Sequence, residues 1–151
     1  MNFTIVNPEG LGAPKGWNHG LLAPRDGRLL FVAGQAGWDA GEAGSGASGA
    51  APGFVEQFAH ALDKILAVVR AAGGGPEDVA RMTIFVTDLS AYLAGRALLG
   101  EVWRARFGKH YPAMALLEVC RLVDHGALVE IEATAVIAGE GAGKGGREGA
   151  S

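Results

Sequence analysis

Two short segments of the chain are apolar at every position, and this feature limits the folds that the chain can adopt. They are residues 29–33 (LLFVA), which end at Gly34, and residues 113–117 (AMALL). Successive side chains of a strand point to opposite faces, so a strand of this composition is buried on both sides. The sheet that contains these segments therefore needs a covering layer on each face.

Two segments have helical periodicity. Residues 54–72 carry an apolar stripe and an opposite polar arc, and the glycines of residues 73–75 end the helix before Pro76. The stripe is Phe54, Phe58, Ala61, Leu62, Ile65 and Val69, and the arc is Glu56, Gln57, His60, Asp63, Lys64 and Arg70. A second helix is expected from about residue 91 to residue 107, with Ser90 as its N-cap. Its core-facing side chains are expected to be Tyr92, Leu99, Val102 and Trp103.

The other apolar segments are predicted to be strands, which gives the order β-β-α-β-α-β-β and an α+β fold. The strands are residues 3–6, 29–33, 79–87, 113–120 and 128–137. Two helices cannot cover both faces of such a sheet, so we expect them to pack on one face. The strands that are apolar on both sides then require a second cover, and another copy of the chain would provide it. The pattern predicts a homo-oligomer without giving the number of subunits.

The last strand alternates between acidic and apolar residues. Glu130, Glu132 and Thr134 share one face, while Val129 and Ile131 lie on the other. If the apolar set faces the helices, both carboxylates point to the helix-free face. They could bond to backbone N–H groups or arginines across a subunit interface. Alternatively, one of them could lie in a cleft between subunits and orient a water molecule or a ligand.

Composition and charge limit the domain organisation and the partners. Residues 40–53 are almost entirely Gly, Ala and Ser, which is typical of a flexible loop, and residues 139–151 are expected to form a disordered tail. We therefore predict one domain, residues 1–138. The net charge of −3 provides no global attraction for nucleic acid, and the sequence shows neither a signal peptide nor a membrane-length apolar run. With a single cysteine, Cys120, these features indicate a cytoplasmic protein with no membrane or nucleic-acid partner.

Four stretches in a shared order resemble the Rid/YjgF family of reactive intermediate deaminases and endoribonuclease L-PSP-like proteins. They are residues 29–35 (LLFVAGQ), 57–79, 83–89 (TIFVTDL) and 112–133, the last with Pro112-Ala113, Glu118-Val119, Arg121-Leu122 and then Val129 to Ala133. Order and spacing hold from about Pro8 to Ile137. The resemblance implies a chorismate-mutase-like fold. It also implies a homotrimer with a central barrel and ligand clefts between its subunits.

The resemblance also indicates which residues line that cleft, and the chain departs from the deaminase pattern there. In the deaminases an arginine follows Pro-Ala and holds the substrate carboxylate as a bidentate fork, whereas this chain has Met114. The corresponding positions for a cysteine, a serine, an N-terminal tyrosine and an asparagine carry Leu116, Ala33, Trp17 and Ser90. Glu130 remains at the position that orients the attacking water, and Gly34 would contribute its backbone.

The substitutions predict a cleft that is apolar and aromatic, which suits a neutral or cationic, partly apolar ligand better than a typical 2-imino acid. One hypothesis is a deaminase or an amide or imine hydrolase acting on a small metabolite, with Glu130 as its catalytic residue. The alternative is a non-catalytic binding or regulatory trimer, and a ribonuclease or translation inhibitor is the least supported. The four histidines have no metal-ligand spacing, so no metal or other cofactor is expected.

Overall fold

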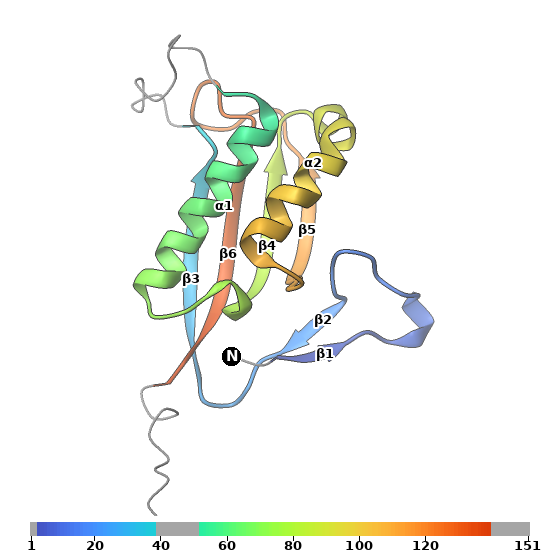
Figure 1. Ribbon diagram of the computed structural model, residues 1–151, viewed down its shortest axis with the longest axis vertical. Coiled ribbons are helices and arrows are strands. Elements are labelled where there is room, and N and C mark those ends of the chain that lie inside the picture. Colours follow the sequence, from blue (N-terminus) through green and yellow to red (C-terminus); the bar gives the residue numbers. More distant parts are fainter. Residues whose placement is uncertain (1–2, 39–51, 140–151) are drawn as a thin grey trace, which may run out of the picture.

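The computed structural model describes residues 3–38 and 52–139, and Figure 1 shows how their elements are arranged. The predicted loop of residues 40–53 and the predicted tail of residues 139–151 lie almost wholly outside these residues. The elements are β1 (Thr4–Val6), β2 (Gly20–Leu22), β3 (Gly27–Ala36), α1 (Phe54–Ala71), β4 (Val79–Val86), α2 (Leu89–Phe107), β5 (Ala113–Glu118) and β6 (Val129–Ala138).

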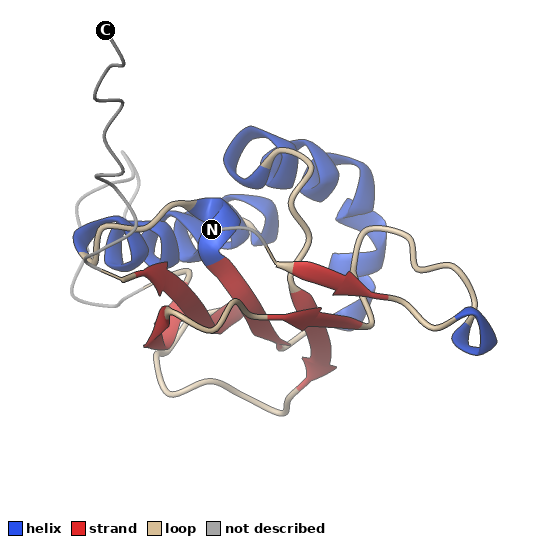
Figure 2. Cartoon of the chain, turned by 90° about the horizontal axis from the view of Figure 1, so that it is seen from below, coloured by secondary structure: helices blue, strands red, loops and turns tan. Residues whose placement is uncertain are grey.

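The main sheet has four strands in the order β3-β6-β4-β5, and both helices cover one of its faces (Figures 1 and 2). β4 pairs with β5 in parallel, and the other pairs are antiparallel. The predicted α+β fold with two helices on one face of a mixed sheet is confirmed. The predicted element order lacks β2, which pairs with β1 in a separate two-stranded sheet. With only three residues, this strand has too little alternation to be detected in the sequence.

The face that each strand turns to the helices follows the predicted alternation. Met82 and Val86 of β4 are fully buried beneath the helices, as are Val129 and Ile131 of β6. Across the β4–β6 pair, Phe85 lies opposite Glu130. The carboxylates of β6 therefore point to the helix-free face, as predicted.

The helix-free face carries exposed apolar side chains in the single chain. Phe31 is 76% exposed and Leu29 is 62% exposed, and both belong to the segment that is apolar at every position. Leu117, on the other edge strand, is 46% exposed and is paired with Phe85. An apolar surface of this kind on an edge strand is unusual without a partner.

Two local expectations for the helices are wrong. Gln57 does not lie on a solvated arc but is fully buried, because its amide bonds to the loop that precedes β6. The N-cap of α2 is Asp88 and not Ser90, and its Oδ1 accepts a hydrogen bond of 3.0 Å from the N–H of Ala91. Asp and Ser are equally good N-caps, so the sequence offered no means of choosing between the two positions.

The predicted strand of residues 113–120 extends two residues too far, since β5 ends at Glu118. Cys120 is exposed beyond it.

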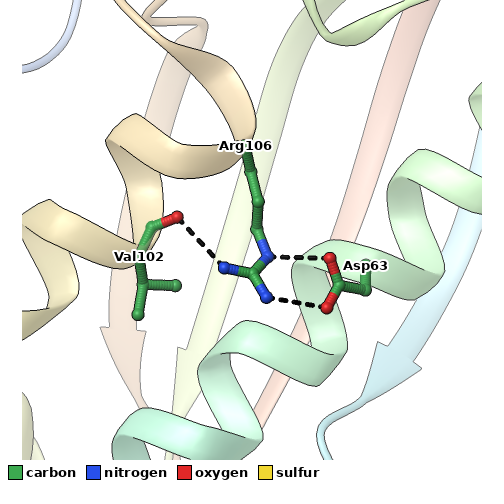
Figure 3. A network of polar contacts seen from close by, with 3 residues as sticks. All are labelled: Asp63, Val102 and Arg106. Carbon is green, nitrogen blue, oxygen red and sulfur yellow. Dashed lines mark hydrogen bonds and ion pairs between the residues drawn. The ribbon is translucent and has the colours of Figure 1, made fainter.

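Asp63 and Arg106 join the two helices on the side away from the sheet (Figure 3). Nε and Nη2 of Arg106 donate to the two carboxylate oxygens of Asp63 over 2.7 and 2.8 Å, and Nη1 donates to the Val102 carbonyl over 3.3 Å. The hydrogen bonds from Arg106 hold the pKa of Asp63 below its ordinary value of 3.8, against the opposing effect of partial burial. The bidentate geometry fixes the spacing of α1 and α2.

We expect Asp63→Asn to lower the free energy of unfolding by less than about 1 kcal/mol at neutral pH, since half of the Asp63 side chain is exposed. The folded pKa lies below the unfolded one, so the contribution is present above pH 3.8 and is lost as the pH falls through the folded pKa. Denaturant unfolding between pH 7 and pH 2 checks this. The difference from wild type should vanish at the acid end, and the exposed Glu56→Gln should show no such convergence.

Candidate functional site

A bulge in β3 makes room for the carboxylate of Glu130. Between Val32 and Gln35 the register advances by three residues on β3 but by two on β6. A Cβ atom at Gly34 would collide with Oε1 and Cδ of Glu130. Only glycine at position 34 therefore leaves space for the glutamate where it lies. This explains why the predicted pair Gly34 and Glu130 occurs together.

A hollow of about 290 Å³ lies beside this carboxylate, and its walls are largely polar. Its lining residues are Gly34, Gln35, Ala36, Lys64, Val123, Asp124 and Glu130. Lys64 was expected to be solvated on the outer arc of the first helix. It is instead half-buried, and its Nζ donates to the Ala36 carbonyl over 3.1 Å. The glutamate thus lies in a polar recess with a lysine, an arrangement that can hold water.

A second hollow, of about 400 Å³, brings together three of the predicted cleft residues, Trp17, Met114 and Leu116. Met114 and Leu116 pair with Met82 and Ile84 across the β5–β4 ladder, so they face the helices and not the helix-free side. The hollow lies between the N-terminal part of β5, helix α2 and the segment before β2. Its other lining residues are Lys15, Gly16, Ile84, Tyr92 and Arg96.

A chain of side-chain amides holds Trp17 in place over this hollow. Nδ2 of Asn18 donates to the Tyr111 carbonyl over 2.6 Å, just before β5 begins. Oδ1 of Asn18 accepts from Nδ2 of Asn7 over 3.0 Å, and Oδ1 of Asn7 accepts from the N–H of His19 over 2.8 Å. The Trp17 and His19 rings meet edge to face at 4.5 Å. The segment is therefore tied to β5 directly beside Met114.

One chain does not assemble all the predicted site residues. Glu130 and Gly34 form one group and Trp17, Met114 and Leu116 form another, and the two groups turn to opposite sides of the sheet. Ala33 and Ser90 are exposed and line neither hollow. Among residues 3–38 and 52–139, no three His, Cys, Asp or Glu side chains gather as a metal site requires, and no helix has the length and apolarity to cross a membrane.

Sequence reasoning missed the cations of the second hollow. Lys15 precedes Trp17 by two residues, and Arg96 follows Tyr92 by one helical turn. The spacing of Tyr92 and Arg96 could have signalled that both reach the same region. The predicted apolar and aromatic cleft, with Glu130 as its remaining acidic group, did not include the two positive charges in the wall of this hollow.

The geometry defines a two-helix α+β domain of the chorismate-mutase-like class, with a carboxylate recess and a separate aromatic hollow. A family model described as endoribonuclease L-PSP matches residues 11–137. The chain therefore belongs to this family, which is also called the Rid/YjgF family.

Individual relatives agree with this assignment. A RutC family protein of Pyrococcus horikoshii is 34% identical over 125 residues, which cover 82% of this chain and 90% of the relative. The crystal structure of a conserved Rid family protein of unknown function from Yersinia pestis has a TM-score of 0.71 and 30% identity, and covers 91% of this chain and all of that chain. TdcF of Escherichia coli, a proposed reactive intermediate deaminase, is 37% identical over 59% of this chain and 68% of its own length. The structure of TdcF with bound serine has a TM-score of 0.56 and 29% identity, and covers 84% of this chain and 92% of that chain.

Proposed function

We propose that this protein is a trimeric deaminase or amide or imine hydrolase that acts on a small carbon–nitrogen metabolite other than a typical 2-imino acid. The proposal assigns Glu130 the task of orienting the attacking water. Support comes from the family, from the proposed deaminase activity of TdcF, and from the serine bound in the TdcF structure. The observation that carries the proposal is the space that Gly34 leaves for the Glu130 carboxylate.

A ring of subunits would bring the two groups of site residues together. β3 and β5 are the two edges of the main sheet. If the sheets of several copies close into a barrel, β5 of one subunit adjoins β3 of the next. The edge strand that carries Met114 and Leu116 in one copy would then lie beside the bulge at Gly34 of its neighbour, next to the recess of Glu130. The exposed Phe31 of β3 would be covered in the same step.

The edge strands would also supply donors to a polarised substrate atom. The bulge at Gly34 interrupts the β3–β6 ladder, and the outer edge of β5 carries backbone groups that pair with no strand of the main sheet. We infer that backbone N–H groups around Gly34 and Leu116 would stabilise developing negative charge. With Glu130 as a base towards water, these donors would complete a simple hydrolytic site.

We expect Glu130→Gln to reduce turnover by about 100-fold or more, because the amide cannot accept a proton from water. The measurement is ammonia release from a panel of small amines, amides, enamines and imino acids. Glu132→Gln is the matched control, since Glu132 shares the face of Glu130 but lies 4.0 Å from Arg81 and lines neither hollow. Unchanged turnover in Glu130→Gln would contradict the assignment of Glu130.

A non-catalytic binding trimer is the second candidate, and one observation favours it. Within the described part of a single chain, residues 3–38 and 52–139, the hollow of Met114 and Leu116 has no acidic residue in its wall. Ligand-induced stabilisation without any turnover, retained in Glu130→Gln, would favour this function. A ribonuclease receives less support, because Arg106 in the densest basic segment is already paired with Asp63.

A further inference from the structure

The aromatic hollow, which is the hollow of Trp17, Met114 and Leu116, carries positive charge in its wall. A smaller hollow of about 230 Å³ adjoins it, and the two share Lys15, Gly16, Ile84, Tyr92, Arg96 and Met114. The smaller one also includes Arg104 in its wall. Among the residues that the structure describes, 3–38 and 52–139, the two hollows together have three cations and no Asp or Glu in their walls. This excess is local, since the whole chain has a net charge of −3.

These cations make no ion pair with any of residues 3–38 and 52–139, whereas two other arginines do. Arg106 is paired with Asp63, and Arg81 lies 4.0 Å from Glu132. Within residues 3–38 and 52–139, neither a hydrogen bond nor an ion pair ties the side chain of Lys15 or Arg96 to another residue. A cation with no carboxylate nearby in a concave, partly apolar site is available to an anionic ligand.

Helix α2 carries two of these arginines on either side of a glycine, Gly100. Arg96, Gly100 and Arg104 are spaced by four residues and so lie on one helix face. A Cβ at Gly100 would lie 3.3 Å from Nη1 of Arg104, so the guanidinium leans over the glycine. Glycine weakens a helix interior, but here it leaves open surface between two positive groups. The same helix places Tyr92 one turn before Arg96, at the apolar end of the hollow.

We propose that this hollow binds a carboxylate that carries an apolar or aromatic body. The carboxylate lies against Arg96 and Lys15, and the body lies against Met114, Leu116 and Trp17. Arg96 on α2 thus supplies the positive charge that Met114, the residue after Pro112-Ala113, lacks. This inference deepens the proposed function, since it names the ligand class of the same cleft. It replaces the neutral or cationic ligand expected from the sequence.

The test is calorimetric titration of the full chain with five small probes. Phenylacetate should bind more tightly than phenylacetamide, which has the same shape without charge, and more tightly than phenethylamine, which has the opposite charge. Acetate should bind weakly because it lacks the apolar body. Binding of phenylacetate should weaken as salt is raised. Equal or tighter binding of phenylacetamide or phenethylamine would overturn the proposal, as would a preference for phenyl phosphate over phenylacetate.

Variants then locate the carboxylate. Arg96→Gln should weaken phenylacetate binding about 10-fold, the loss expected for one charge-assisted hydrogen bond at a partly exposed site. Gly100→Asp, which places a negative charge between the two arginines, should weaken it as well. Arg25→Gln is the matched control, because Arg25 is exposed and lines neither hollow, and it should bind as wild type does. Unchanged affinity in both Arg96→Gln and Gly100→Asp would overturn the proposal.

The outcomes separate this inference from the proposed function. If phenylacetate binding depends on Arg96 while no substrate is turned over, the proposed ligand class is supported and the proposed hydrolase is contradicted. If turnover depends on Glu130 while phenylacetate binding does not depend on Arg96, the proposed hydrolase is supported and the proposed ligand class is contradicted.

Discussion

Replacing Phe31 by glutamate should convert the assembled protein into monomers. Phe31 is 76% exposed in the single chain and belongs to a strand whose other side packs under the helices. In the proposed barrel this ring is buried between subunits, and a carboxylate there would lose its hydration without gaining a partner. A buried, unpaired charge costs several kcal/mol per copy, and the closed ring repeats that cost in each subunit.

Sedimentation velocity at micromolar concentration measures this change directly. The wild type should sediment as a trimer and Phe31→Glu as a folded monomer. Val68→Glu is the control, because Val68 is an exposed apolar residue on the helix side of the chain, and it should leave the assembly intact. A wild type that is monomeric, or a Phe31→Glu variant that sediments as the wild type does, would contradict the barrel.

Replacing Gln57 by leucine should lower the free energy of unfolding by about 3 kcal/mol or more. The amide nitrogen of Gln57 donates to the carbonyls of Pro52 and Gly126, each over 3.0 Å, and its Oε1 accepts from the N–H of Leu128 over 2.8 Å. Leucine has a similar size but makes none of these bonds. Two backbone acceptors and one donor, all in part-buried hydrogen bonds, would then lose their partner.

Denaturant unfolding at one fixed protomer concentration checks this, since the stability of an oligomer depends on concentration. Gln35→Leu is the matched control. Gln35 is only half-buried, and its amide makes a single local bond of 3.1 Å to the Ala33 carbonyl. Loss of this one hydrogen bond in Gln35→Leu should change the free energy of unfolding by about 1 kcal/mol or less. A Gln57→Leu variant as stable as Gln35→Leu would show that the hydrogen bonds of Gln57 contribute little.

The main elements could be predicted because their periodicity reports directly on which face is buried. The stripe from Phe54 to Val69 and the alternation of β6 both place side chains as observed. The same reasoning failed for Gln57, because periodicity assigns a polar residue to solvent and cannot register a distant loop that offers two hydrogen-bond partners, Gly126 and Leu128. It also missed β2, whose three residues show no alternation.

The candidate site was harder to predict because its parts come from separate elements. Glu130 and Met114 were identified through resemblance to a family, but only the register of β4 with its two neighbours shows that they face opposite sides of the sheet. Arg96 was not singled out in the sequence, since an arginine on a helix is usually solvated and its spacing from Tyr92 is only a weak signal. Arg96 becomes a candidate ligand-binding residue only because Lys15 and Trp17, which lie near the start of the chain, form the wall of the same hollow.

The order of strands in the main sheet has a consequence for how such a protein can evolve. Glu130 lies on an inner strand between Val129 and Ile131, both fully buried, so a change in its position would disturb the core. Met114 and Leu116 lie on an edge strand and are only half-buried. Substitutions there reshape the hollow at little cost in stability. A change in what the hollow binds can therefore be made on the edge strand without disturbing the inner strand.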